Sequence, residues 1–183
     1  MPGKHVGVCP LQTAMVSLET TVMSTSPDTL TRTNPQQSQL SQFLPYQLSV
    51  ASNAVSGLIA ERYRKRFGLK ILEWRVMAVL GDDTSGQGLT QRALTDATLM
   101  DKVAVNRACK VLEARGLIER APNACDGRSH LMVLTAEGRA IHEEVLPLAL
   151  ATQAELLDSF APEEQAVLRS MLERLLRRAQ DLI

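Results

Sequence analysis

Five side chains between positions 102 and 110 have the chemistry and the helical spacing to read DNA. They are Lys102, Val103, Asn106, Arg107 and Lys110. Arginine and lysine donate hydrogen bonds to guanine or to phosphates, asparagine can pair with adenine, and a branched apolar side chain can contact a thymine methyl group. We expect base contacts from Arg107 and Asn106, and mainly phosphate contacts from Lys102 and Lys110. An ordinary amphipathic helix with a solvated face is the alternative.

Three further charged residues lie in or beside a predicted β-hairpin that follows this helix: Arg120, Asp126 and Arg128. Arg128 is near the tip, where a long cation can enter the narrow, electronegative minor groove. Asp126 is expected to pair with an arginine, either Arg107 or Arg128, and to hold it in position. Arg120 is expected to meet a phosphate or only solvent. If Arg128 is instead a screened surface charge, it contributes little.

Residues 89 to 138 would form the elements that position these side chains. Thr90 and Asp101 are good N-caps for a short helix and for the helix from Lys102 to Arg115, here called the reading helix. Gly116 supplies its left-handed stop. Its inward face would be an apolar stripe: Val105, Ala108, Cys109 and Leu112. Two short strands are then expected: Leu117 to Ala121 and Leu131 to Thr135. This order predicts a winged helix-turn-helix, whose second helix enters the major groove.

Long helical segments flank this lobe. The periodicity predicts helices from Leu44 to Phe67, from Leu72 to Leu80, from Thr135 to about Phe160 with a kink at Pro147, and from Pro162 onward. The last helix has an apolar stripe that a small lobe cannot bury: Leu168, Met171, Leu172, Leu175, Leu176 and Ala179. We therefore expect a homodimer, which would place two reading helices about one DNA turn apart. A monomer that folds these helices back on itself is the alternative.

The composition fits one mainly α-helical domain behind a tail. Of the 183 residues, 45% are hydrophobic and 3% aromatic, and the net charge is zero, so a DNA-binding surface must come from local clustering. Residues 1–40 are rich in Ser, Thr, Pro and Gln and are predicted to be a disordered tail, with Met23 as a plausible alternative start. Residues 41–183 would form the domain, with dimerisation helices at 41–68 and 136–183 and a DNA-binding lobe at 69–135.

Several classes of function are disfavoured. No apolar run approaches the length that spans a membrane, and the three cysteines show no CxxC or metal-binding spacing. The histidines His5, His130 and His142 are isolated, and His142 would lie in a helical surface run, so no catalytic arrangement is expected. The expectation is a reduced, cytoplasmic protein that is not an enzyme and holds no metal or cofactor.

The reading helix, the hairpin and the preceding helix together resemble the multiple-antibiotic-resistance regulator (MarR) family, over roughly Gln42 to Leu182. The matching residues are Glu73, Trp74, Arg75, Val76, Leu80, Met100, Asp101, Lys102, Val105, Arg107, Leu112, Arg115, Gly116, Leu117, Ile118, Arg120, Asp126, Arg128, Leu131, Leu134, Thr135 and Gly138. The resemblance implies an obligate homodimer that binds a palindromic operator in double-stranded DNA. It also implies release by a small ligand, in a pocket between the dimer base and the DNA-binding lobe. Asn106 stands where the family often has a small hydroxyl residue, which suggests its own operator preference. The tail is longer than the family needs.

Trp74 and Arg75 lie near that expected pocket, and Ser52 and Ser56 of the first helix could line it from the other side. An arginine beside an aromatic wall suits a planar aromatic carboxylate, because it can form a charge-assisted bond while the rings stack. We expect an aromatic acid or phenolic effector that releases a repressor from DNA. The alternative is that Trp74 belongs to the core and Arg75 forms an ion pair with Glu73 or Asp101.

Two other mechanisms stay open. Redox control through a cysteine needs an exposed thiolate with a depressed pKa. Cys109 falls on the inward stripe, Cys125 lies beside Asp126, which disfavours its thiolate, and Cys9 is in the tail. A winged helix that binds a protein instead of DNA is the second alternative, and in that case the basic residues could change without loss of function.

Overall fold

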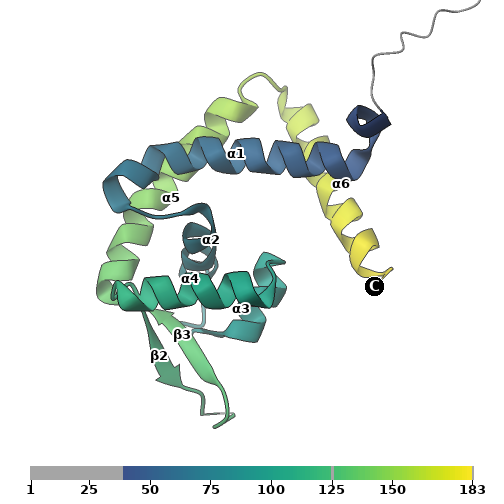
Figure 1. Cartoon of the computed structure of the whole chain (residues 1–183). Coiled ribbons are helices and arrows are strands. Elements are labelled where there is room, and N and C mark those ends of the chain that lie inside the picture. Colours follow the sequence, from purple (N-terminus) through teal and green to yellow (C-terminus); the bar gives the residue numbers. More distant parts are fainter. Residues whose placement is uncertain (1–38, 125, 183) are drawn as a thin grey trace, which may run out of the picture. The chain divides into compact units, whose positions relative to one another are not determined.

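The computed structural model describes residues 39–124 and 126–182, and Figure 1 shows the arrangement of their helices and strands. The elements in chain order are η1 (Gln39–Gln42), α1 (Leu44–Phe67), α2 (Ile71–Gly81), β1 (Leu89–Thr90), α3 (Gln91–Thr98), α4 (Lys102–Ala114), β2 (Ile118–Pro122), β3 (His130–Leu134), α5 (Ala136–Leu157) and α6 (Pro162–Gln180). The predicted tail lies outside the described residues, except for positions 39 and 40, which belong to the 3-10 helix η1. The predicted fold class, a mainly helical winged helix-turn-helix with a small hairpin, is confirmed.

Helix α1 begins and ends where the sequence predicts. Pro45 lies in its first turn, where the missing N–H of proline is not needed. Gly68 ends the helix in the left-handed region, with a φ of 64°, and its N–H donates to the carbonyl of Arg64. Only Ala60 and Tyr63 of this helix are buried, so its first half is open to solvent. Its second half packs beside α5 (Figure 1).

Side-chain caps determine where α3 and α4 begin, as predicted. The hydroxyl of Thr90 accepts the N–H of Ala93 at 3.1 Å, and the carboxylate of Asp101 accepts the N–H of Ala104 at 2.8 Å. The turn between the two helices passes through Leu99, whose φ is 51°. These caps orient the reading helix, α4, relative to α3.

The hairpin of β2 and β3 is antiparallel, with Ile118 opposite Leu134 and Pro122 opposite His130. Each predicted strand is confirmed to within one residue at either end. The sheet has a third strand, β1, which the sequence analysis missed; it pairs with β3, and the strand order is β1-β3-β2. A two-residue strand is too short to show the alternation that predicts strands.

The core lies where α1, α2, α4, α5 and the sheet meet. Its fully buried side chains include Tyr63, Leu69, Met77, Leu94, Val105, Leu112, Leu117, Ile118, Met132 and Val145. The predicted inward stripe of α4 is confirmed, because Val105, Ala108, Cys109 and Leu112 are all buried. The opposite side of α4 therefore faces outward.

The two C-terminal helices differ in how they pack. Thr135 caps α5 through the N–H of Gly138 at 3.0 Å, and Pro147 lies inside this helix. Helix α5 ends at Leu157, before the predicted Phe160, because the chain there already turns, with the N–H of Phe160 donating to the carbonyl of Leu157. Helix α6 begins at Pro162 as predicted, but none of its residues is buried. Of the two helices in the fold-back alternative, α5 packs on α1 and α2, whereas α6 does not fold back onto the core.

Two features are absent from the described part of the chain. No helix there is both long enough and apolar enough to cross a membrane. The same residues contain no group of three His, Cys, Asp or Glu side chains that could hold a metal ion.

Candidate nucleic-acid interface

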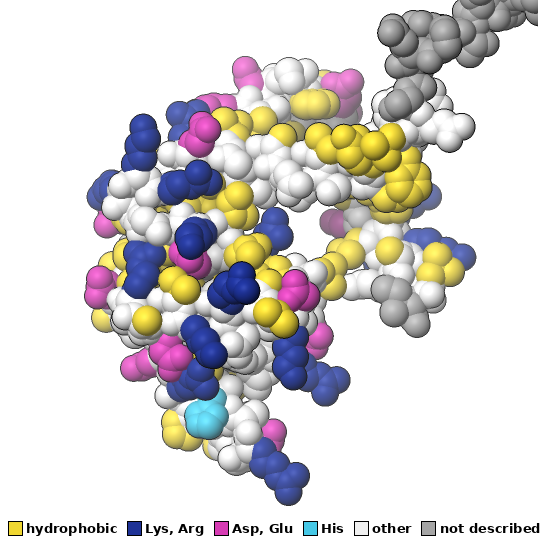
Figure 2. Space-filling model, viewed as in Figure 1, with side chains coloured by type: hydrophobic (Ala, Val, Ile, Leu, Met, Phe, Trp, Pro, Cys, Tyr) yellow, Lys and Arg dark blue, Asp and Glu magenta, His cyan; other side chains and the backbone are white. Residues whose placement is uncertain are grey.

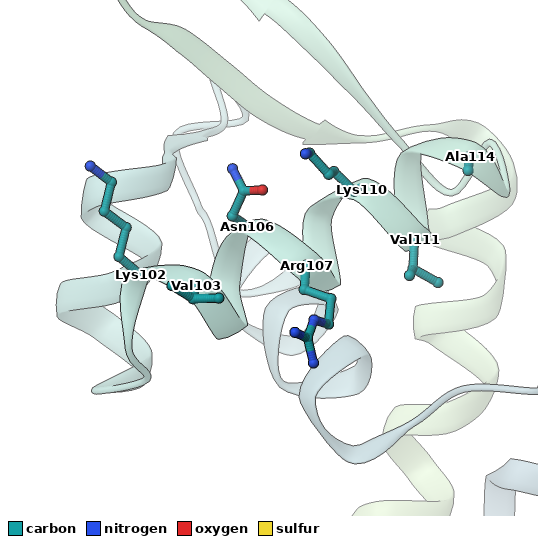
Figure 3. Close-up of a pocket in the computed structure, with 7 residues that line it drawn as sticks. All are labelled: Lys102, Val103, Asn106, Arg107, Lys110, Val111 and Ala114. Carbon is teal, nitrogen blue, oxygen red and sulfur yellow. The ribbon is translucent and has the colours of Figure 1, made fainter.

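The outward side of α4 presents the five predicted residues in two rows. Figure 3 shows Lys102, Asn106 and Lys110 pointing to one side of the helix, and Arg107 and Val111 pointing to another. This follows from helix geometry, since residues four apart lie above one another. Val103 is 67% exposed, which is unusual for a branched apolar side chain and leaves it free for an apolar contact. The sequence predicts one face for all five residues, whereas in the structure Arg107 points to another side of the helix than Lys102 and Lys110 (Figure 3).

Residues 39–124 and 126–182 supply no carboxylate that neutralises the cations of this surface. Among the ion pairs of the described residues, none involves Lys102, Arg107, Lys110 or Arg128. In Figure 2, Lys and Arg side chains gather over α4 and the hairpin, whereas hydrophobic side chains gather over the first half of α1. A local basic surface therefore exists on a chain of zero net charge.

Asn106 is held by a residue of the preceding helix. Its Nδ2 donates to Oε1 of Gln91, the first residue of α3, at 3.3 Å. Gln91 was not among the predicted residues, and only the packing of α3 against α4 brings the two amides together. Next to it, Arg92 is exposed and lines the same groove as Arg128, so it is a second basic residue that the sequence analysis missed.

The hairpin places Arg128 near its exposed tip, but its predicted ion pair is absent. The carboxylate of Asp126 accepts the backbone N–H of Arg128 at 3.0 Å, and the carbonyl of Asp126 accepts the N–H of Ser129 at 3.0 Å. No ion pair joins Asp126 to Arg107 or Arg128 within the described residues. Asp126 shapes the turn because an aspartate readily accepts a hydrogen bond from the backbone two residues on.

Arg120 has a partner that the sequence analysis did not foresee. Its guanidinium donates two hydrogen bonds to the carboxylate of Glu113 on α4, at 2.9 and 3.1 Å. This bidentate pair gives Arg120 a carboxylate partner in place of the expected solvent contact, and its contact with a phosphate stays a prediction. It ties β2 to the reading helix across an exposed surface.

The predicted effector residues separate into two groups. The ring of Trp74 stacks on that of His142, with centroids 5.6 Å apart, and lies 5.8 Å from the ring of Tyr63. Trp74 therefore packs against the core. His142 is 8% exposed, which corrects its assignment to a surface run. Burial lowers its pKa, because it disfavours the charged ring.

Arg75 instead turns towards α1. Its Nη2 donates to the hydroxyl of Ser56 at 3.3 Å, while Ser52 stays exposed. The alternative ion pairs of Arg75 with Glu73 or Asp101 are absent from the described residues. The structure thus brings together two of the four predicted effector residues, Arg75 and Ser56.

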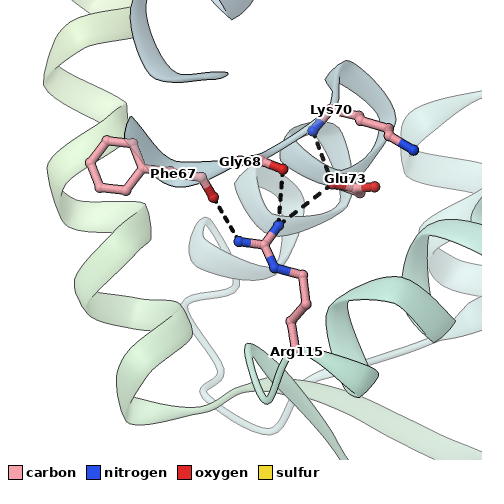
Figure 4. Close-up of polar contacts among 5 residues, drawn as sticks. All are labelled: Phe67, Gly68, Lys70, Glu73 and Arg115. Carbon is pink, nitrogen blue, oxygen red and sulfur yellow. Dashed lines mark hydrogen bonds and ion pairs between the residues drawn. The ribbon is translucent and has the colours of Figure 1, made fainter. Parts of the chain in front are cut away.

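Glu73 pairs with Arg115, at the end of the reading helix (Figure 4). The guanidinium of Arg115 also donates to the carbonyls of Phe67, at 2.6 Å, and Gly68, at 3.1 Å. Glu73 in turn accepts the N–H of Lys70 at 2.9 Å and is only 4% exposed. One arginine therefore joins the end of α4 to the end of α1 and the start of α2.

A cavity of about 310 Å³ lies beside this junction, between the end of α1, the start of α2 and the reading helix. Three cations border it, Arg64, Lys70 and Arg107, together with an apolar wall that includes Leu72 and Val111. Such a lining suits a small organic anion with an apolar body.

The only cysteine of the described residues is Cys109, which is fully buried in α4. Burial is the main cause that raises the pKa of its thiol to about 11, so the reactive thiolate is suppressed. Cys9 and Cys125 lie outside the described residues.

Several known proteins are similar to this chain in sequence or in fold. A model of the MarR family matches residues 67–129. The transcriptional regulator HosA of Escherichia coli is 27% identical over 104 residues, which cover 57% of this chain and 75% of HosA. The crystal structure of a MarR/EmrR family transcriptional regulator from Acinetobacter sp. ADP1 superposes with a TM-score of 0.71 at 24% identity, covering 79% of this chain and 99% of that one.

A third similar structure is that of Bordetella bronchiseptica BpsR, whose DNA binding is regulated by 6-hydroxynicotinic acid. It has a TM-score of 0.65 at 22% identity and covers 74% of this chain and 94% of BpsR. The chain has the winged helix-turn-helix fold of these proteins. It is similar to MarR-family transcriptional regulators, and the family model matches the segment from α2 to β2.

Proposed function

We propose that this chain is a homodimeric, sequence-specific repressor that releases its palindromic operator when it binds a small aromatic acid or phenol. The observation that carries the DNA-binding part is the outward side of α4, where cations that form no ion pair within the described residues flank an exposed Val103. Phosphate oxygens accept hydrogen bonds from cationic side chains, and base edges form hydrogen bonds with cationic and amide side chains. A helix that presents both kinds of side chain is therefore suited to bind DNA. In this proposal α4 enters the major groove and Arg128 the minor groove.

Individual residues have different roles in the proposal. Arg107 and Asn106 contact bases, and Lys102 and Lys110 contact phosphates. Val103 touches a thymine methyl group. Asp126 holds the wing turn that presents Arg128. Arg120 reaches a phosphate only when its pair with Glu113 opens, so it contributes least.

The test is a titration of the protein onto DNA from upstream of its own gene, at two salt concentrations and against random DNA. Replacing Arg107 or Asn106 by Ala should cost about 1–3 kcal/mol and relax specificity at one position. Lys110→Ala should weaken binding to all DNA sequences alike and reduce the dependence of the affinity on salt concentration. Arg174→Ala, an exposed cation of α6, is the matched control. Binding no better than to random DNA at every salt concentration would contradict the proposal.

The homodimer is proposed from the apolar surface that the single chain leaves open. The stripe of α6 stays exposed at Leu168, Met171, Leu172, Leu175 and Leu176, and the start of α1 exposes Leu44 and Val50. Contiguous apolar surface of this kind marks an interaction site. Leu172→Glu should give monomers in sedimentation and weaken binding to a two-half-site operator, whereas Glu173→Gln on the same helix should do neither. A wild-type chain that sediments as a monomer would contradict the dimer.

The effector proposal rests on Arg75 and Ser56, with Trp74 and Ser52 as the other predicted lining residues. A guanidinium can exchange a hydroxyl partner for a carboxylate, which forms a stronger, charge-assisted bond. The regulation of BpsR by 6-hydroxynicotinic acid supports an aromatic acid as the ligand class.

Competition with a panel of aromatic acids tests the effector. Arg75→Met should abolish release from DNA, whereas Arg64→Met, which changes a cation of the cavity beside the reading helix, should leave it intact. If Arg64→Met abolishes release and Arg75→Met does not, the effector binds in that cavity instead. If no acid or phenol weakens DNA binding, the effector proposal is wrong.

A further inference from the structure

We infer that Gln91 determines which base Asn106 reads, by holding the Asn106 amide in one of its two orientations. Gln91 is thus a positioning residue that sets operator specificity from outside the reading helix. This inference rests on the proposed function, in which Asn106 contacts a base. The observation behind it is the contact between the two amides, which joins the first residue of α3 to α4.

The hydrogen bond leaves a defined pattern facing outward. An asparagine amide has one acceptor oxygen and two N–H donors. Since Nδ2 of Asn106 already donates one hydrogen to Oε1 of Gln91, the oxygen and the second N–H remain for DNA. Adenine offers an N6 donor beside an N7 acceptor, which complements this pair, whereas guanine offers two acceptors. The held amide therefore favours adenine.

The other orientation requires Gln91 to change as well. Turning the amide of Asn106 over would bring its oxygen against Oε1 of Gln91, so two acceptors would face each other unless the Gln91 amide also turned over and presented its Nε2. Without an acceptor at position 91, the Asn106 amide could adopt both orientations. Its affinities for adenine and guanine would then be more similar. The side chain at position 91 thus influences the orientation of the Asn106 amide, which Asn106 alone does not fix.

A second observation indicates that Gln91 is there for a reason other than stability. Its Nε2 is the single buried side-chain nitrogen or oxygen, in the part of the chain that the structure describes, that has no hydrogen-bond partner. A buried donor without a partner costs free energy. Such costs are found where a residue has a functional role. Gln91 also lines the groove that contains Arg92 and Arg128, so it lies at the proposed DNA surface.

The experiment measures the ratio of affinities for adenine and guanine at the operator position that Asn106→Ala affects. Wild type should prefer adenine about tenfold. Gln91→Met, which has similar length but no comparable acceptor, should reduce the ratio to about twofold or less while keeping the salt dependence of binding. Gln91→Glu keeps an acceptor and should retain the ratio, although its added charge should weaken binding to all sequences alike. Gln91→Met should also unfold at the same denaturant concentration as wild type or higher, because it removes the unpartnered donor.

The outcomes separate the inference from the proposed function. If Asn106→Ala removes the preference and Gln91→Met retains it, the role of Gln91 is wrong and the base contact stands. If Asn106→Ala changes no preference at any position, the base contact and the inference fail together. If Gln91→Glu loses the preference as completely as Gln91→Met, the acceptor is not the cause, which also overturns the inference.

Discussion

The guanidinium of Arg115 lies 3.8 Å from the buried carboxylate of Glu73, and it is the only cation paired with that carboxylate in the described chain. The same guanidinium donates to the carbonyls of Phe67, the last residue of α1, and of Gly68, its C-cap, at a helix end whose carbonyls have no partner within the helix itself. Because Glu73 also holds the first turn of α2, three helices meet at one side chain. This junction sets the position of the reading helix relative to α1.

Replacing Arg115 by Ala should therefore destabilise the fold by about 1–3 kcal/mol, because it leaves carbonyls and a buried carboxylate short of donors. Arg115→Lys keeps the charge but cannot reach three acceptors at once, so its loss should be intermediate. The measurement is the midpoint of urea unfolding at one protein concentration. Arg120→Ala is the matched control, since an exposed ion pair contributes less than about 1 kcal/mol. Equal midpoints for Arg115→Ala and Arg120→Ala would show that the junction has no special role.

Gly138→Ala should destabilise the protein although alanine is the better helix former. A Cβ at position 138 would collide with the backbone carbonyl of Leu117, which also accepts the N–H of Thr135. Backbone cannot move aside cheaply, so we expect a loss of about 1–3 kcal/mol. Gly57→Ala in α1 meets no neighbour in the chain and should cause no loss. Thermal unfolding of both variants checks this, and a Gly138→Ala protein as stable as wild type would contradict it.

The buried His142 should make the fold less stable in acid. Its folded pKa lies below the ordinary value of 6.5, since burial disfavours the charged ring. As the pH falls through 6.5, the unfolded chain takes up a proton that the folded chain does not, so the free energy of unfolding decreases. Below the folded pKa both states are protonated and this decrease levels off.

The measurement for His142 is the denaturation midpoint between about pH 8 and about pH 5. His142→Phe keeps an aromatic ring against Trp74 and should flatten the pH dependence. His130→Ala, which removes an exposed histidine of β3, should leave the dependence as in wild type. If His142→Phe has the same slope as wild type, other groups cause the acid sensitivity.

Cys109 should resist thiol reagents in the folded protein. Its thiol is buried and its pKa is raised to about 11, so the thiolate is scarce near neutral pH. In a chain with Cys9→Ser and Cys125→Ser, a thiol reagent at about pH 8 should label the protein only after unfolding. Peroxide should also leave the DNA binding of this variant unchanged. Rapid labelling of the folded variant would show that Cys109 is accessible and would revive redox control through this residue.

The local features of this protein were predictable from its sequence alone. Thr90, Asp101 and Gly116 mark where helices begin or end, because each acts on backbone groups only a few residues away. The inward stripe of α4 was equally predictable, since helical periodicity decides which residues share a face. These features were sufficient to predict the winged helix-turn-helix and the exposed basic residues.

Contacts between elements were decided only by the tertiary structure. The periodicity of α5 placed His142 on that helix but could not show that Trp74 of α2 would cover it. In the same way, the pairing of Gln91 with Asn106 and that of Arg115 with Glu73 depend on how α3, α4 and α2 pack. Helix packing brings together residues that are distant in the chain. A short-range sequence pattern therefore cannot predict which of these side chains are in contact.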